Sequence, residues 1–175
     1  YYHIFQEQKG TRVVKDGKEF IMLSSNDYLG LSRHPKIKEA GIEAMKQWGS
    51  GTTGARLANG GRIFHQRLEE KLADFVGKEA CHVFSAGYLA CASAVTGFAE
   101  RKDRIFADKN LHSSLWSGIQ LSGATCERFA HNNPGHLRKI LEDEEEATAK
   151  LFVLEGVYSM EGHIAKLTEF VELAQ

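Results

Sequence analysis

The sequence predicts an α/β fold in which crossover helices cover a sheet. From Ala80 onward, short apolar runs alternate with segments of helical spacing, which is typical of such folds. Asn133-Pro134 can cap one of these helices and begin its first turn. We expect strands at residues 80–84, 104–108, 125–129 and 150–155, and helices at residues 88–99, 113–121, 134–146 and 167–174.

The first part of the chain predicts a short arm, a small hairpin and a helix. The arm covers residues 4–10, and Asp16-Gly17 between two apolar runs is a turn signal typical of a hairpin. His34-Pro35 leads into a helix at residues 36–48, whose apolar residues lie roughly on one side.

Residues 49–56 are too rich in glycine and hydroxyl groups for either regular element. We therefore expect their backbone to be held close to another group. A loop through Asn59-Gly60-Gly61 precedes a second helix at residues 63–76, which has an apolar stripe and which Gly77 can end.

Composition bounds the class of protein. At 175 residues, the chain is long enough for one well-buried domain. Its 22 Lys plus Arg and 23 Asp plus Glu residues give a formal net charge of −1, which favours neither nucleic acid nor an anionic membrane surface as a partner. The three cysteines lie in apolar surroundings without metal-ligand spacing, which predicts reduced thiols and no metal site. The sequence has no run of about 18 apolar residues and no basic-then-apolar leader, so we expect a cytoplasmic protein without stable membrane insertion.

Residues 85–90 predict a phosphate site. They end an apolar run and open a helical segment, which places small residues and free backbone N–H groups at a helix N-terminus. His112 offers an imidazole at the next strand-to-loop junction, and Glu155 closes another apolar run at the edge where α/β sheets keep their chemistry. In this order the three features predict half of a cofactor pocket. Taken singly, they could be a strand-to-helix turn, a structural histidine and a structural carboxylate anchor.

Blocks of residues in this order resemble the α-oxoamine synthases. The similarity extends from about residue 20 to the last residue, and the blocks are residues 24–30, 49–56, His65 with 68–72, 85–90, 108–115 and 155–162. That family comprises pyridoxal-phosphate enzymes that condense an amino acid with an acyl-CoA and lose carbon dioxide, among them 8-amino-7-oxononanoate synthase, 2-amino-3-ketobutyrate CoA ligase and serine palmitoyltransferase. The resemblance implies a homodimer with an aspartate-aminotransferase-like fold (fold type I), which has a mostly parallel sheet and is incomplete in this chain.

The resemblance also implies roles for residues of the predicted pocket. Gly87 and Tyr88 match positions whose backbone approaches the cofactor phosphate, and Ser85 belongs to the same cofactor-binding block. His112 matches a catalytic histidine whose ring lies over the pyridine face of the cofactor.

Further site residues follow from the same resemblance. Glu155 and Ser159 match a strand-end glutamate and a pocket serine beside the cofactor. Asn26 matches a loop asparagine on the substrate side, and an Asx-turn is the alternative. A glycine-rich block near the dimer interface of the family is matched by Thr52, Thr53 and Arg56. A flexible surface loop is the alternative for these residues.

The resemblance divides the chain into two parts and leaves the substrate open. Residues 1–48 are expected to form an N-terminal arm, hairpin and first helix, and residues 49–175 the N-terminal part of the large domain that binds pyridoxal phosphate. The resemblance implies alanine, glycine or serine as the amino acid and does not specify the acyl-CoA.

A pyridoxal-phosphate enzyme needs a lysine that holds the cofactor as an imine and an acidic partner for the pyridine nitrogen. In the family both come later than the residues present here, and Lys109, Lys150 and Lys166 lie in other contexts. Three interpretations follow: the N-terminal part of an active synthase, a non-catalytic subunit or pseudoenzyme that stabilises a partner, and a free-standing module that binds another anion near Gly87.

Overall fold

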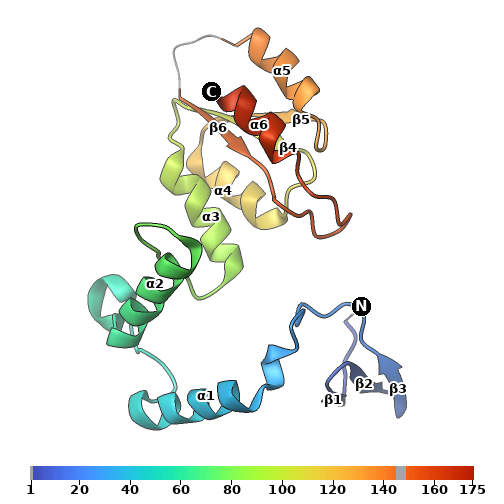
Figure 1. Ribbon diagram of the computed structural model, residues 1–175, viewed down its shortest axis with the longest axis vertical. Helices are drawn as coiled ribbons and strands as arrows, with labels where there is room; N and C mark the ends of the chain where they lie inside the picture. Colours follow the sequence, from blue (N-terminus) through green and yellow to red (C-terminus); the bar gives the residue numbers. More distant parts are fainter. Residues whose placement is uncertain (1, 145–148) are drawn as a thin grey trace. The chain divides into compact units, whose positions relative to one another are not determined.

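The computed structural model describes residues 2–144 and 149–175. This part of the chain forms two compact units, Tyr1–Arg67 and Leu68–Gln175 (Figure 1). The first unit holds an antiparallel sheet and a helix that buries none of its residues. The second holds a parallel sheet and nearly all of the buried apolar residues.

The small sheet of the first unit has three strands. They are β1 (Glu7–Lys9), β2 (Arg12–Lys15) and β3 (Lys18–Ile21), with β2 in the middle. Asp16 and Gly17 both have positive φ angles, as a tight two-residue hairpin turn requires, so the expected hairpin is confirmed. The expected arm is wrong in part, because its residues pair with the free edge of β2 and supply a third strand.

Three helical elements follow the small sheet, the last of them at the end of the glycine-rich segment. η1 (Leu31–Arg33) precedes α1 (Pro35–Trp48), which begins with a proline in its first turn and ends at the expected residue. η2 (Arg56–Gly60) is a π-helical turn at the end of the glycine-rich segment. A Cβ on Gly60 would lie 2.0 Å from the carbonyl oxygen of Gly54. The backbone is therefore held close to its own preceding residues, as the composition predicted.

The second unit is built on a parallel sheet in the order β5-β4-β6. Its strands are β4 (Arg104–Asp108), β5 (Thr125–Phe129) and β6 (Lys150–Val153). The helices from residue 63 onward are α2 (Ile63–Val76), α3 (Gly87–Phe98), α4 (Ser113–Ser122), α5 (Pro134–Glu142) and α6 (Leu167–Ala174). Helices alternate with these strands, so the expected crossover pattern is confirmed.

Helices cover both faces of this sheet. Successive residues of β4 point to opposite faces, so neighbouring β4 residues pack in different clusters. Ile105 and Ala107 pack in one cluster with residues of α3 and α4. Phe106 packs on the other side with Leu137 of α5 and Phe170 of α6. These three β4 residues are fully buried, so the sheet lies in the centre of the core.

The strand expected at residues 80–84 is wrong. A strand needs a neighbour for its backbone hydrogen bonds, and within residues 2–144 and 149–175 no strand pairs with this segment. The N–H of Val83 instead donates to Oε1 of Glu69 at 2.8 Å.

Two other elements end earlier than expected. β6 ends at Val153, and Glu155 lies in the following loop, where it binds the backbone N–H of His112. α5 ends at Glu142. The last two positions of the helix expected at residues 134–146, residues 145 and 146, lie outside the described residues.

Candidate cofactor site

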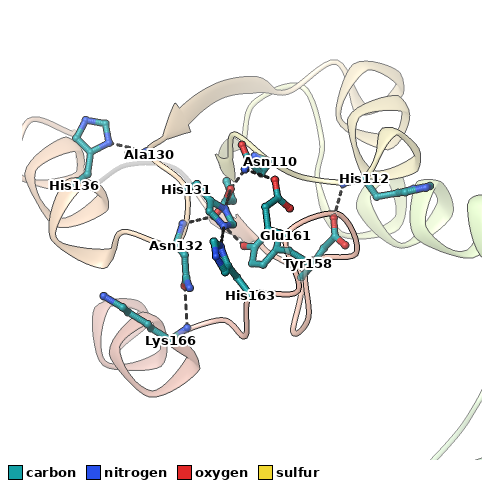
Figure 2. Close-up of polar contacts among 12 residues, drawn as sticks. Asn110, His112, Ala130, His131, Asn132, His136, Tyr158, Glu161, His163 and Lys166 are labelled. Atoms are coloured by element: carbon teal, nitrogen blue, oxygen red, sulfur yellow. Dashed lines mark hydrogen bonds and ion pairs between the residues drawn. The ribbon is translucent and has the colours of Figure 1, made fainter. Parts of the chain in front are cut away.

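The carboxyl ends of β4, β5 and β6 meet at one edge of the parallel sheet, where α/β proteins place their chemistry. The loops that leave this edge cover residues 109–112, 130–133 and 154–166. Figure 2 shows polar side chains from all three loops pointing toward one another.

His112 is held by its ring and by its backbone. Its Nδ1 accepts from the N–H of Ser114 at 3.2 Å and lies 2.7 Å from the Ser114 hydroxyl, so His112 caps α4. Its backbone N–H donates to Oε1 of Glu155. The ring of Tyr88 stands at 75° to the imidazole, with the centroids 6.4 Å apart. The neighbours thus fix His112 while its side chain stays exposed.

The N-terminus of α3 has no side-chain cap. Ala86 occupies the N-cap position with an extended backbone, and its methyl group cannot accept a hydrogen bond. Ser85, Gly87 and Tyr88 are exposed, and a Cβ on Gly87 would meet no described atom within 4 Å. The first-turn N–H groups and the positive end of the helix dipole therefore fit a phosphate.

The structure brings three predicted site residues together at the sheet edge: Tyr88, His112 and Glu155. Glu155 is half-buried, and its bond to the His112 backbone joins residues that are 43 positions apart in the chain. Ser159 lies exposed on the same 154–166 loop. Glu155 therefore anchors His112, whatever else its carboxylate binds.

The predicted substrate and interface residues belong to the first unit. Asn26 is exposed in the loop before η1. The Thr52 hydroxyl donates to the carbonyl oxygen of Gly54 at 3.2 Å, and the Thr53 hydroxyl donates to that of Thr52 at 2.7 Å. Arg56 begins η2. Both threonines thus order their own loop, and the roles in substrate binding and dimerisation stay predictions.

Sequence reasoning missed Asp108, a fully buried carboxyl at the end of β4. Burial raises its pKa, but hydrogen bonds outweigh that effect, so the pKa lies below its usual value. Two sequence signals could have found it: an acidic residue ends an apolar strand, and a polar pair follows the next strand. The donors come from Asn110, His131, Asn132 and Tyr158.

Residues 18–175 match the sequence model of a family described as aminotransferase class I and II. The chain belongs to this family. An 8-amino-7-oxononanoate synthase of Geotalea daltonii is 39% identical over 173 residues, and one of Chromobacterium violaceum is 41% identical over 170 residues. These alignments cover 98% and 97% of this chain but 44% of each relative, so the chain spans less than half the length of these relatives.

Solved structures show the same likeness. A serine palmitoyltransferase from S. paucimobilis with a bound PLP-myriocin aldimine has a TM-score of 0.95 and 38% identity, over 99% of this chain and 44% of that one. An 8-amino-7-oxononanoate synthase from Francisella tularensis has a TM-score of 0.72 and 27% identity, over 86% and 41%. The resemblance to the α-oxoamine synthases and the expected fold are therefore confirmed, and the chain covers part of that fold.

Among residues 2–144 and 149–175, every helix is too short or too polar to cross a membrane.

Proposed function

We propose that this chain forms the N-terminal part of a pyridoxal-phosphate-dependent α-oxoamine synthase, which condenses alanine, glycine or serine with an acyl-CoA and releases carbon dioxide. The observation that carries the proposal is the arrangement at one sheet edge, where Glu155 holds His112 beside Tyr88 of the uncapped helix α3. The names of the curated relatives and solved neighbours support it.

The residues of the sheet edge have distinct tasks in this proposal. When bound, pyridoxal phosphate supplies an electron sink for the carbon next to the amino group. The N–H groups of Gly87 and Tyr88 bind its phosphate, with Ser85 beside them. The imidazole of His112 would help to hold the cofactor and orient the substrate, while Glu155 holds the His112 backbone in place.

The remaining site residues extend the proposal to the substrate and to a second subunit. Ser159 contributes a hydroxyl to the pocket, and Asn26 lies on the substrate side. The protein acts in the cytoplasm as a homodimer, and residues 1–48 and 49–175 form its N-terminal part and the first part of its large domain. The residues proposed for the dimer interface are Thr52, Thr53 and Arg56.

A non-catalytic subunit of the same fold that stabilises a partner is the second candidate. The lysines near the sheet are compatible with either candidate. Lys150 lies within β6, and Lys109 and Lys166 lie in loops that do not match the family's lysine loop, so we assign none of them as the imine-forming residue. A full-length chain without a lysine in that later block would select this candidate.

The first test is an intact-mass measurement on the full-length protein after incubation with pyridoxal phosphate and reduction with borohydride. We expect one pyridoxyl adduct, and release of CoA when alanine, glycine or serine is supplied with an acyl-CoA. A protein that carries no adduct and releases no CoA contradicts the proposal and favours the non-catalytic subunit.

Gly87→Pro tests the phosphate site of the same protein. The extended backbone of Ala86 and the first helical position both tolerate proline, so the variant removes one N–H from an intact helix. Because a hydrogen bond to a charged group contributes about 1.5–3 kcal/mol, the Kd for pyridoxal phosphate should rise about 10- to 100-fold. The Kd for pyridoxal, which has no phosphate, should change little. Equal losses for both ligands would show that the phosphate is not the group bound there.

A further inference from the structure

Asp108 is a buried carboxylate whose hydrogen-bonding capacity is full. Its Oδ1 accepts from the N–H of Asn110 at 2.8 Å and from Nδ1 of His131 at 2.9 Å. Its Oδ2 accepts from the N–H of Asn132 at 2.6 Å and from the Tyr158 hydroxyl at 2.9 Å. The two N–H groups and the phenol already donate to this carboxyl, and an ionised carboxyl only accepts, so we assign the proton of the fourth contact to Nδ1 of His131.

His131 extends this network to His163. Nε2 of His131 and Nδ1 of His163 are 2.9 Å apart, the ring centroids are 5.2 Å apart, and the ring planes are 22° from parallel. These values describe two imidazoles joined edge to edge by one hydrogen bond. The His131 ring also packs at 90° against Tyr158, and its side chain is only 13% exposed. Asp108, His131, Tyr158 and His163 together are called the Asp108 network.

The Asp108 network ties the 154–166 loop to the ends of β4 and β5. The tyrosine and the second histidine of the network lie on this loop (Figure 2). Asn132, next to His131, adds two bonds to the end of the loop: its Nδ2 donates to the Ile164 carbonyl oxygen at 2.9 Å, and its Oδ1 accepts from the N–H of Lys166 at 3.0 Å. The loop is therefore held from two sides, by Asp108 at the end of β4 and by His131 and Asn132 after β5.

The same loop begins with Glu155, whose carboxylate binds the backbone N–H of His112. A displacement of the loop would move this carboxylate away from His112. We propose that His131 is a positioning residue of the synthase site, which uses the Asp108 network to hold the 154–166 loop so that Glu155 keeps His112 in place. This inference rests on the proposed function, in which His112 would help to hold the cofactor and orient the substrate.

Two substitutions separate the bonds of His131. His131→Asn keeps a donor near the position of Nδ1 for Asp108 but cannot reach His163, whereas His131→Phe loses both bonds. The matched control is His136→Phe. Nδ1 of His136 accepts from the N–H of Ala130 at 2.9 Å, and its side chain points away from the Asp108 network (Figure 2).

The first readout is independent of activity. In the full-length protein without cofactor, amide hydrogen exchange across residues 155–166 should be about tenfold faster in His131→Phe than in the wild type. It should be intermediate in His131→Asn and unchanged in the control variant, and residues 104–108 should exchange as in the wild type throughout. Unchanged exchange across the loop in His131→Phe would overturn the inference.

The second readout separates positioning from general structural damage. His131→Phe should lower kcat about tenfold and leave the KM for acyl-CoA nearly unchanged, because orientation and not binding is affected. In a Glu155→Ala background, which removes the acceptor for the His112 N–H, the same substitution should have little further effect, because His131 acts through Glu155. Losses that multiply would overturn the inference. A wild-type protein that releases no CoA would instead reject the proposed function, and the exchange comparison would still decide whether His131 holds the loop.

Discussion

Replacing Tyr158 with phenylalanine removes one donor from the buried carboxylate of Asp108. The Tyr158 hydroxyl donates to Oδ2 at 2.9 Å, and both residues are almost completely buried. Phenylalanine keeps the ring and its packing against His131, so the change isolates the hydrogen bond. A hydrogen bond to a charged group contributes about 1.5–3 kcal/mol. Since Oδ2 keeps the N–H of Asn132, we expect a loss of about 2 kcal/mol from the free energy of unfolding.

The assay is urea denaturation of the full-length protein without cofactor. This loss lowers the urea midpoint by the lost free energy divided by the denaturant slope, which increases with the surface exposed on unfolding. Tyr88→Phe is the matched control, because the Tyr88 hydroxyl bonds to the Ser117 hydroxyl of α4 and Tyr88 is 48% exposed. A substitution at such a surface position should change the free energy of unfolding by less than about 0.5 kcal/mol.

The pH dependence of the stability of Tyr158→Phe tests whether the hydroxyl of Tyr158 donates to an ionised Asp108. The pKa of Asp108 is lowered in the folded protein, so its ionised form contributes stability above the usual value of 3.8, and this contribution is lost as the pH falls through the folded value. A protonated carboxyl no longer needs the phenol as a donor, so the difference between Tyr158→Phe and the wild type should shrink in acid. A loss no larger than that of Tyr88→Phe, or a difference that persists in acid, would refute the reasoning.

Two further predictions concern helix packing and alkaline pH. Gly118→Ala should destabilise the protein by about 1–3 kcal/mol in the urea assay, because its Cβ would lie 2.7 Å from the Ala92 carbonyl oxygen and 2.9 Å from Cβ of Val95. A Cβ on Gly97 would meet no described atom within 4 Å, so Gly97→Ala should instead stabilise its helix by up to about 1 kcal/mol. Changes in the free energy of unfolding of the same sign for both variants would contradict this account. Burial and hydrogen bonding to a carboxylate raise the pKa of Tyr158, so its contribution to stability is complete below the usual tyrosine pKa of about 10 and is lost as the pH rises through the higher folded value. Ultraviolet titration should show one tyrosine that ionises only as the protein unfolds, and a titration without this late step would count against the assignment.

Local patterns in the sequence were sufficient for most elements of the fold and for parts of the site. The bounds of β4, β5 and α2 agree with the predicted ranges, because hydrophobic periodicity and turn residues act over a few positions. The start of α5 is a clear case, since the Asn133 side chain accepts from the N–H of His136 at 2.9 Å and a proline follows it. The start of α3 at Gly87 lies one residue before the predicted start at residue 88.

Contacts between distant residues were not readable in this way. Residues 80–84 are apolar enough for a strand, but a strand forms only where a neighbour accepts its backbone hydrogen bonds. Sequence reasoning named both His112 and Glu155 but not the bond between them. The donors to Asp108 include residues 24 and 50 positions away.

By itself, the sequence determined the helices, the central strands, the family and the chemical groups of the candidate site, because each depends on short-range spacing or on blocks in a fixed order. Only the tertiary structure decided how those groups hold one another. The parallel sheet brings the ends of β4 and β5 beside the 154–166 loop, and a buried carboxylate must find its donors wherever the fold places them.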